Sequence, residues 1–321
     1  MNRKISIPVL IIIALAFSFL LGACSTSATP AATTPPTPLP ATQAADQPIV
    51  LTDGLNRTVS LDKPAQRVVS MAPSNTEILY AVGAGSQVVG RDEFSDYPAE
   101  ATKLPSIGGS YGEYNNEAIV DLKPDLVLAS ELNTAEQVQA LEDLGLKVYL
   151  LSNPTDLEGM YKNLEIVAEL TGHQKDAAEL VQSLKGRVAA VEAKLQNVSE
   201  QPLVFYELDS TDPNAPYTAG GGTFIDTLMT MAKGRNLGDS LSGQYAQISL
   251  EELVVQNPDI ILLGDYTWGG VTPADVAKRA GWEKLSAVQN GKVYTFDDNL
   301  VSRPGPRLVD GLEALANQLH P

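Results

Sequence analysis

A twelve-residue pattern occurs twice in this chain and limits the folds that the chain can adopt. The first copy begins at Glu117 and reads EAIVDLKPDLVL, and the second begins at Glu251 and reads EELVVQNPDIIL. The glutamate, the proline and the aspartate of one copy are each 134 residues from their counterparts in the other. In each copy a short helical pattern is stopped by the proline and followed by a buried strand. The repeat therefore predicts two similar lobes, one on each side of a central segment.

Short β-branched, apolar runs alternate with helical patterns from residue 67 onward, which is typical of an α/β fold with parallel sheets. The predicted fold class is α/β, with two Rossmann-like lobes. Strands are expected over residues 67–71, 87–90, 125–129 and 147–151 of the first lobe, and over 203–207, 259–263 and 292–296 of the second. Helices are expected between them, for example over 75–82, 134–144 and 222–231.

The central segment, residues 156–197, contains two helical patterns that break near Thr171 and Gly172. Apolar residues in the second pattern recur at steps of three and four and form one stripe. They are Leu180, Val181, Leu184, Val188, Val191 and Leu195. Such a helix spans on the order of 35 Å and would join two lobes rigidly; an ordinary packing helix inside one large domain is the alternative. The predicted boundaries are 49–155 for the N-terminal lobe, 156–197 for the connecting helices and 198–321 for the C-terminal lobe.

The N-terminus has the pattern of an export signal. Arg3 and Lys4 precede an apolar run that is short for a membrane-spanning helix and ends in Leu-Gly-Ala-Cys24. This ending resembles the lipobox of bacterial lipoproteins, which implies that residues 1–23 are removed and that Cys24 becomes lipidated. A signal peptide with an incidental cysteine, or an uncleaved anchor, is the alternative. Residues 24–48 are rich in Ala, Thr and Pro and predict an extended tether, so the folded part is expected just outside a membrane, on its extracytoplasmic side.

The composition excludes several classes of function. The chain has 22 Lys+Arg against 39 Asp+Glu, a net charge of −17, which argues against binding to nucleic acid. With two histidines and one cysteine, it cannot build a multi-histidine metal site, a cysteine-rich zinc or iron–sulfur site, or an intramolecular disulfide. We expect no bound metal and no resident cofactor.

Several short motifs follow one another in the order seen in a known family. They are RVVSMAPSNTE at 67–77, VVG at 88–90, SDYP at 95–98, IGG at 107–109, LKPDLV at 122–127 and RPGPR at 303–307. This succession resembles the class III substrate-binding proteins of ABC importers, the cobalamin and ferric-siderophore binders, and covers about residues 67–321. The resemblance implies two α/β lobes joined by one long helix, with the ligand in the cleft and little hinge closure. It also implies a monomeric, non-enzymatic protein whose partners are a small-molecule metal chelate and the permease subunits.

The resemblance further implies that one acidic side chain on each lobe docks onto arginines of the permease. The matching residues are Glu117 and Glu251, the pair that the repeat already singles out. A carboxylate in the first turn of a helix is also favoured by the helix dipole, by roughly 0.3–1 kcal/mol. The dipole explains each glutamate alone, but not why both lobes carry one at the same step of the repeat.

Ligands of open parallel sheets bind beyond the carboxyl ends of the strands. The candidate ligand-binding residues in those loops are Ser74, Phe94, Tyr111, Ser130, Tyr217, Tyr245, Trp268, Asp298 and Arg303. Tyr111 and Tyr245 each lie six residues before a repeat glutamate, and the family motifs imply that they and Arg303 face the cleft. Aromatic rings could hold a large, flat, partly apolar chelate, although any one of them could instead fill a core.

The charge of the ligand can be weighed from the same loops. They offer Arg91, Arg303 and Arg307 but no basic cluster. A strongly anionic ferric siderophore should prefer several arginines or lysines. The sequence therefore favours a neutral cobalamin-type corrinoid, with a ferric siderophore or haem next.

Two other functions compete with capture of a chelate for import. Residues 108–112 fit the G-x-S-x-G pattern of α/β-hydrolases, with Ser110 as nucleophile and His320 downstream. That pattern requires a strand directly before the serine and a helix directly after it, and Pro105 with the residues 113–116 argues against both. The other alternative is a sensory or adhesive surface lipoprotein that has no role in transport.

Overall fold

The N-terminal lobe is built on a four-stranded parallel sheet in the order β4-β3-β5-β6. The computed structural model describes residues 48–109 and 112–321. All residues of β3, β5 and β6 are buried, as expected for a parallel sheet covered on both faces. The strands are β3 (Val68–Ser70), β4 (Val88–Arg91), β5 (Leu126–Ser130) and β6 (Val148–Leu151), which confirms the four strands predicted for this lobe.

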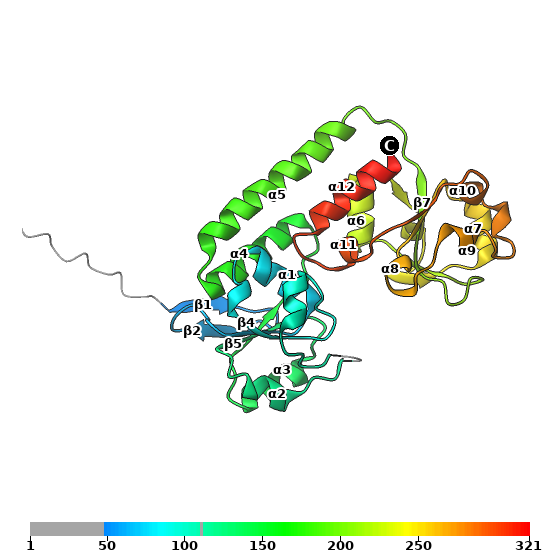
Figure 1. Ribbon diagram of the computed structural model, residues 1–321. Coiled ribbons are helices and arrows are strands. Elements are labelled where there is room, and N and C mark those ends of the chain that lie inside the picture. The colour runs from blue at the N-terminus through cyan, green and yellow to red at the C-terminus, as the bar shows by residue number, and fades with distance from the viewer. Residues whose placement is uncertain (1–47, 110–111) are drawn as a thin grey trace, which may run out of the picture. The chain divides into compact units, whose positions relative to one another are not determined.

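Helices cover this sheet and an additional hairpin precedes it (Figure 1). The helices are α1 (Pro73–Ala81), α2 (Asn116–Asp121) and α3 (Ala135–Asp143), with 3₁₀ turns at η1 (Gly85–Gln87) and η2 (Ala99–Lys103). The antiparallel hairpin of β1 (Ile49–Thr52) and β2 (Thr58–Leu61) was not expected from the sequence. Its two strands have four residues each and alternate between inward and outward positions, so neither has the continuous buried run of the core strands.

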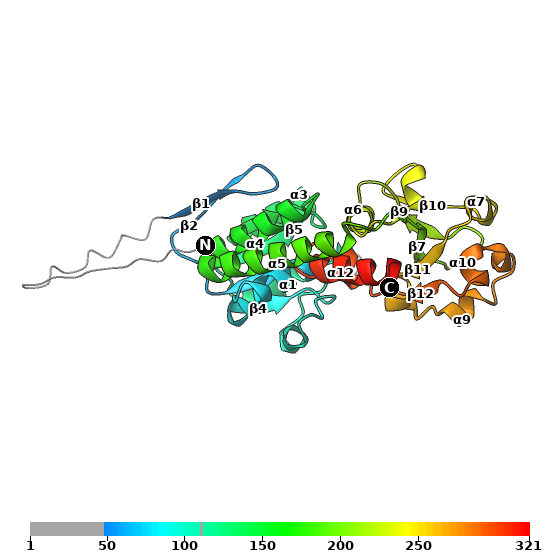
Figure 2. The same ribbon diagram turned by 90° about the horizontal axis from the view of Figure 1, so that it is seen from above.

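The central segment forms two helices, and they break where the sequence predicts. They are α4 (Leu157–Thr171) and α5 (Gln174–Leu195), and the chain turns between them at Gly172, whose φ of 85° favours glycine. The predicted stripe faces inward on α5, where Val181, Leu184, Val191 and Leu195 are buried. The C-terminal helix α12 (Leu308–Leu319) lies alongside α5 (Figures 1 and 2).

The C-terminal lobe contains a mixed sheet in the order β10-β8-β7-β11-β12, with β9 also paired to β7. Its parallel part confirms the three predicted strands and consists of β7 (Leu203–Asp209), β11 (Ile260–Leu263) and β12 (Val293–Thr295). The short β9 (Arg235–Asn236) is also parallel to β7. The strands β8 (Tyr217–Ala219) and β10 (Tyr245–Gln247) are antiparallel and form one edge.

The helices of the C-terminal lobe are mostly short. They are α6 (Phe224–Met231), α7 (Leu250–Gln256), α8 (Tyr266–Gly269), α9 (Pro273–Val276), α10 (Ser286–Gln289) and α11 (Asn299–Ser302), with 3₁₀ turns at η4 (Leu237–Ser240) and η5 (Trp282–Lys284). The fold as a whole is the α/β class that the sequence predicts, with two lobes joined by one long helix.

The sequence repeat corresponds to a structural repeat. Asp125 accepts a hydrogen bond from the backbone N–H of Arg67 at 3.1 Å, and Asp259 accepts one from that of Leu203 at 2.7 Å. Each aspartate thus pins the first core strand of its lobe to the strand that follows the repeat helix. Two positions before these aspartates, Lys123 and Asn257 both adopt left-handed backbone conformations, with φ of 46° and 49°. The two copies therefore fold in the same way, as expected for two related lobes.

One apolar core continues from lobe to lobe along the connecting helices. It includes Val68 under the first sheet, Leu164 on α4, Leu184 on α5 and Leu312 on α12. A core of this kind resists bending, because closely packed side chains cannot shift without losing contacts. Each lobe has a second core on the other face of its sheet.

Candidate functional site

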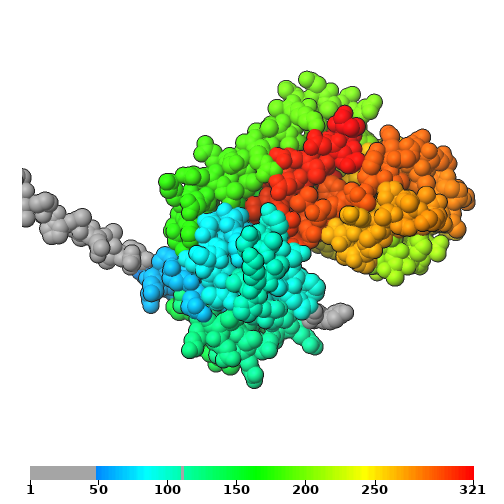
Figure 3. All heavy atoms as spheres, viewed as in Figure 1, coloured from blue at the N-terminus to red at the C-terminus, as the bar shows by residue number. Residues whose placement is uncertain are grey.

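Four exposed aromatic rings lie on the loops and edge strands of the two sheets. Phe94 follows β4 and is 55% exposed, whereas Trp268 lies on α8 after β11 and is 62% exposed. Tyr217 and Tyr245, on the antiparallel edge of the C-terminal sheet, are 42% and 64% exposed. Four of the predicted ligand residues are therefore large apolar surfaces open to solvent, a feature that commonly marks a binding site. The space-filling surface is hollowed between the cyan and green residues of one lobe and the yellow and orange residues of the other (Figure 3).

One hydrogen bond and the pairing of the edge strands position the aromatic residues of the C-terminal lobe. The indole Nε1 of Trp268 donates to the carbonyl of Leu208, at the end of β7, over 3.1 Å. Tyr217 starts β8 directly opposite Asp209, so it lies at the carboxyl end of β7. Tyr245 pairs with Ala219 on the neighbouring strand, two positions further from that end. Trp268 and Tyr217 are thus held at one edge of the sheet.

Asp298 lies where the loop after β12 enters α11, and its carboxylate already has a partner. The hydroxyl of Tyr206 donates to Asp298 Oδ1 over 2.9 Å. Burial raises the pKa of Asp298, while hydrogen bonds from Ser302 and Tyr206 oppose that shift. Thr267 of α8 accepts a hydrogen bond from the backbone N–H of Asp298 and donates to the carbonyl of Phe296. Asp298 therefore ties the loop after β12 to the loop after β11.

The two predicted serines of the N-terminal lobe are buried. Ser130 ends β5, where its hydroxyl accepts from the backbone N–H of Leu132 and its own N–H donates to Asn133. Ser74 lies in the first turn of α1. Both residues are at the predicted edge of the sheet, but the contacts of Ser130 shape its loop. Tyr111 and Cys24 lie outside the described residues, as does Ser110.

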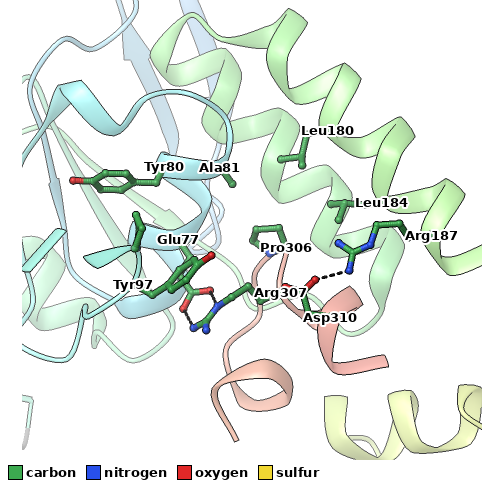
Figure 4. A pocket seen from close by; sticks show the side chains of 11 residues that line it. Glu77, Tyr80, Ala81, Tyr97, Leu180, Leu184, Arg187, Pro306, Arg307 and Asp310 are labelled. Carbon is green, nitrogen blue, oxygen red and sulfur yellow. Dashed lines mark hydrogen bonds and ion pairs between the residues drawn. The ribbon is translucent and has the colours of Figure 1, made fainter. Parts of the chain in front are cut away.

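A buried ion cluster joins the N-terminal lobe to the C-terminal segment. Glu77, on α1, accepts two hydrogen bonds from Arg307, at 2.8 and 2.5 Å, and one from Arg303 at 3.2 Å. Arg303 also donates to Asp96 at 2.6 Å, and the guanidinium of Arg307 lies 4.0 Å from the centre of the Tyr97 ring. The paired groups of Glu77 and Arg307 face one another in Figure 4.

This cluster changes how Arg303 can act in a ligand site. Its guanidinium has two acidic partners within the protein, so it is not a free cation. Glu77 itself was not among the candidates, although it stands in the motif at 67–77. Its charge could have identified it, because Glu77 is the one charged residue of the nine that form α1.

A hollow of about 340 Å³ borders this cluster (Figure 4). It is lined by Glu77, Tyr80 and Tyr97 on one side and by Leu184, Pro306 and Arg307 on the other. None of the predicted ligand residues lines it. The hollow lies at the join between α1, α5 and the segment before α12, so it belongs to the connection between the lobes.

The two repeat glutamates occupy equivalent exposed positions. Glu117 is in the first turn of α2 and Glu251 in the first turn of α7, and both are exposed. Two residues further on, Ile119 and Leu253 are fully buried and anchor the helices to their sheets. Each repeat glutamate is therefore presented on a fixed helix, and on α7 Glu252 is a second exposed acid beside Glu251.

The residues before Ser110 do not form the strand that a hydrolase nucleophile requires. Within 105–109 the chain makes only the isolated bridges of Ser106 with Arg91 and of Gly108 with Tyr114. His320, the proposed base, places its Nε2 3.1 Å from the carbonyl oxygen of Ala232. These contacts argue against the hydrolase alternative.

The chain belongs to the periplasmic binding protein family, whose model matches residues 68–300. It is 36% identical to YvrC of Bacillus subtilis, an uncharacterized ABC transporter substrate-binding lipoprotein, over 85% of this chain and 86% of that protein. It is 30% identical to the cobalamin-binding protein of Halobacterium salinarum, over 87% of this chain and 76% of that protein. A possible iron-binding periplasmic protein from Staphylococcus epidermidis superposes with a TM-score of 0.70, at 31% identity, over 81% of this chain and 100% of that one.

Membership of this family makes the chain a substrate-binding component of an ABC transporter, with the class III fold. Proteins of this kind are extracytoplasmic transport components that work with permease subunits. Within residues 48–109 and 112–321, no helix is long and apolar enough to cross a bilayer. The same residues contain no group of three or more His, Cys, Asp or Glu side chains that could hold a metal ion.

Proposed function

We propose that this protein captures a cobalamin-type corrinoid between its lobes and presents it to the permease of an ABC importer. The observation that carries the proposal is that aromatic rings are exposed while the nearby arginines are already paired with acids of the protein. Phe94, Tyr217, Tyr245 and Trp268 offer apolar surface, while Arg303 and Arg307 are paired with Glu77. Such a site suits a large neutral ligand better than a polyanionic one.

The comparisons support the same ligand class without deciding within it. The relative from Halobacterium is named for cobalamin and the structural relative from Staphylococcus for iron. An iron chelate, as a ferric siderophore or haem, is therefore the second candidate. In either case the metal travels inside the ligand, and the protein needs no ligating side chains of its own.

Ligand titration tests the proposal directly. The full-length protein, purified in detergent, is titrated with cyanocobalamin, haem and a ferric hydroxamate while tryptophan emission is followed. We expect quenching and co-elution of the red corrinoid on gel filtration. Retention of haem or the siderophore alone would replace the corrinoid with the second candidate, and no binding of any of the three would overturn the proposal.

We further propose that Glu117 and Glu251 dock the loaded protein onto arginines of the permease, and that lipidated Cys24 tethers a monomer to the membrane. Exposed charges of this kind mainly set orientation and association rate. In cells, the double variant Glu117→Arg, Glu251→Arg should lose ligand uptake while the purified protein keeps its affinity. The matched control is Glu179→Arg, an exposed acid on α5 that should leave uptake unchanged. Normal uptake by the double variant would contradict docking, whereas normal uptake by cells that lack the protein altogether would favour a sensory or adhesive role.

A further inference from the structure

A second buried ion cluster lies beneath the loops that carry the rings of the C-terminal lobe. The carboxylate of Glu207, near the end of β7, is fully buried and receives two hydrogen bonds from Arg279, at 2.6 and 3.0 Å. Arg279 also donates to the hydroxyl of Ser210 at 2.6 Å, and its guanidinium stacks 4.5 Å from the centre of the Trp282 ring. The arginine is thus fixed on several sides.

The second acid of this cluster, Asp265, is also fully buried. Its Oδ2 accepts a hydrogen bond from Ser210 at 2.6 Å. Its Oδ1 has no hydrogen-bond partner among the residues that the structure describes. An unpaired buried carboxylate oxygen is costly, so this atom calls for an explanation.

A proton shared with a second acid would supply the missing partner. Ser210 links the two acids, because it donates to Asp265 and accepts from the same Arg279 nitrogen that donates to Glu207, and the cluster holds two acids but one cation. Like charges at such short range cannot both persist in a dry site, and one proton between them turns repulsion into a hydrogen bond. Burial, more than any other cause, raises the pKa of Glu207 to about 7, with Arg279 opposing the shift and Asp265 adding to it.

The other ionisable groups nearby do not supply a second cation. Tyr206, adjacent to Glu207 in β7, has a pKa raised well above its usual value by burial and then by Asp298, so it remains a neutral phenol. Asp297 and Asp265 add to that shift. Among the described residues, Arg279 is the cation that contacts the pair, and one cation beside two acids favours retention of the proton.

The cluster also connects two loops. Ser210 begins the loop that leads from β7 to Tyr217, and Asp265 immediately precedes α8, which carries Tyr266 and Trp268. The backbone N–H of Asp265 donates to the carbonyl of Glu207 at 3.2 Å. A change in charge at this point would act on both loops at once.

We propose that Glu207, Asp265 and Arg279 form a positioning cluster that holds one proton between its two carboxyl groups and thereby fixes the loops bearing Tyr217 and Trp268. The inference rests on the proposed function only in treating those loops as ligand-bearing. The proposal does not require any of the three side chains to contact the ligand. Loss of the proton would leave two facing anions and loosen both loops.

Infrared difference spectroscopy of the full-length protein, between about pH 5 and about pH 9, tests for the proton. We expect a carboxylic-acid C=O band that disappears as the pH rises. The same component should be absent from Glu207→Gln and shifted or absent in Asp265→Asn, so the second variant serves if the first does not fold. The matched control is Asp92→Asn, which removes another buried acid whose pKa is raised by burial, and should leave this component intact. A component unchanged in both cluster variants would overturn the shared proton.

Tryptophan emission tests the positioning. The chain has two tryptophans, so a Trp282→Phe background reports on Trp268 alone. We expect the emission of Trp268 to change over the pH range in which the infrared band is lost, and to become independent of pH in Glu207→Gln. Constant emission while the proton leaves would overturn the positioning role. Neither measurement uses a ligand, so failure to bind a chelate would count against the proposed function and not against this cluster.

Discussion

Two buried glutamates, one in each lobe, are neutralised in opposite ways. Glu77 faces two arginines, Arg303 and Arg307. Glu207 faces one arginine, Arg279, and a second buried acid. Among the buried groups, the first site therefore has more cations than acids and the second has more acids than cations.

The two clusters also differ in the parts of the chain that they hold together. The cluster at Glu77 joins segments 230 residues apart in the chain, so its loss should affect the whole fold. The cluster at Glu207 joins adjacent loops, and its excess of acid makes it responsive to pH. The comparison teaches that the number of acids and cations around a buried ion pair decides how the pair responds to mutation and to pH.

The largest expected effect follows from Glu77→Gln. The variant leaves the guanidinium group of Arg307 buried without its acid and Arg303 with only the exposed Asp96, and breaking a buried pair in this way typically costs about 3–5 kcal/mol of unfolding free energy. Urea unfolding of the purified protein measures the loss. The matched control, Glu179→Gln on α5, removes an exposed partner of Lys175 and should change stability by less than about 0.5 kcal/mol. A loss below about 1 kcal/mol for Glu77→Gln would remove the contrast between the clusters.

The pH dependence of stability should come next. The pKa of Glu207 is raised from 4.5 to about 7 on folding, so the folded state binds more protons than the unfolded state between these values. Its contribution to stability is therefore largest below about pH 4.5, is lost as the pH rises to about 7, and is constant above that. The whole change amounts to about 3 kcal/mol. The difference in stability between wild type and Glu207→Gln, followed by urea unfolding across this range, should trace that slope; a difference independent of pH would contradict it.

The rings of the two lobes allow a smaller, functional comparison. Trp268→Ala removes a ring held by a hydrogen bond to Leu208, whereas Phe94→Ala removes one from the other lobe. Each should weaken binding of cyanocobalamin about tenfold, or about 1.4 kcal/mol, in the titration described above. Leu144→Ala, an exposed apolar residue at the end of α3, is the control and should bind normally. An effect confined to one lobe would show that the ligand rests on that lobe alone.

The smallest effect is expected at the rim of the first cluster. The side chain of Asp96 is 61% exposed, although it pairs with the buried Arg303. Because water can replace it, Asp96→Asn should cost less than about 1 kcal/mol in the same unfolding measurement. A loss equal to that of Glu77→Gln would mean that Arg303 depends on the outer acid rather than on the inner one.

The sequence predicted the parts of the fold that have long or repeated patterns. The parallel core strands, the break at Gly172 and the equivalence of Glu117 and Glu251 all follow from periodicity and spacing. The hairpin of β1 and β2 and the antiparallel edge strands β8 and β10 were missed because they lack the continuous buried run that marks core strands such as β3, β6 and β11. Their positions depend on pairing with distant segments.

The candidate site was predictable in its aromatic residues but not in its ion pairs. Exposed rings such as Phe94 and Trp268 follow directly from the rule for the ends of parallel strands. Arg303 pairs with Glu77, which lies 226 residues earlier in the chain, and neither sequence motif alone predicts this pairing. The pairing of Glu207 with Arg279 likewise joins a strand to a segment 72 residues later.

The return of the C-terminal segment to α1 has a consequence for biosynthesis. A secreted chain emerges from its N-terminus, so Glu77 reaches the exterior well before the two guanidinium groups that neutralise it. Until then Glu77 lacks its counter-ions, and we expect the N-terminal lobe to remain incompletely packed. A polypeptide that is cut short just ahead of Arg303 should therefore yield no stable first half, and degradation of such fragments is the expected fate.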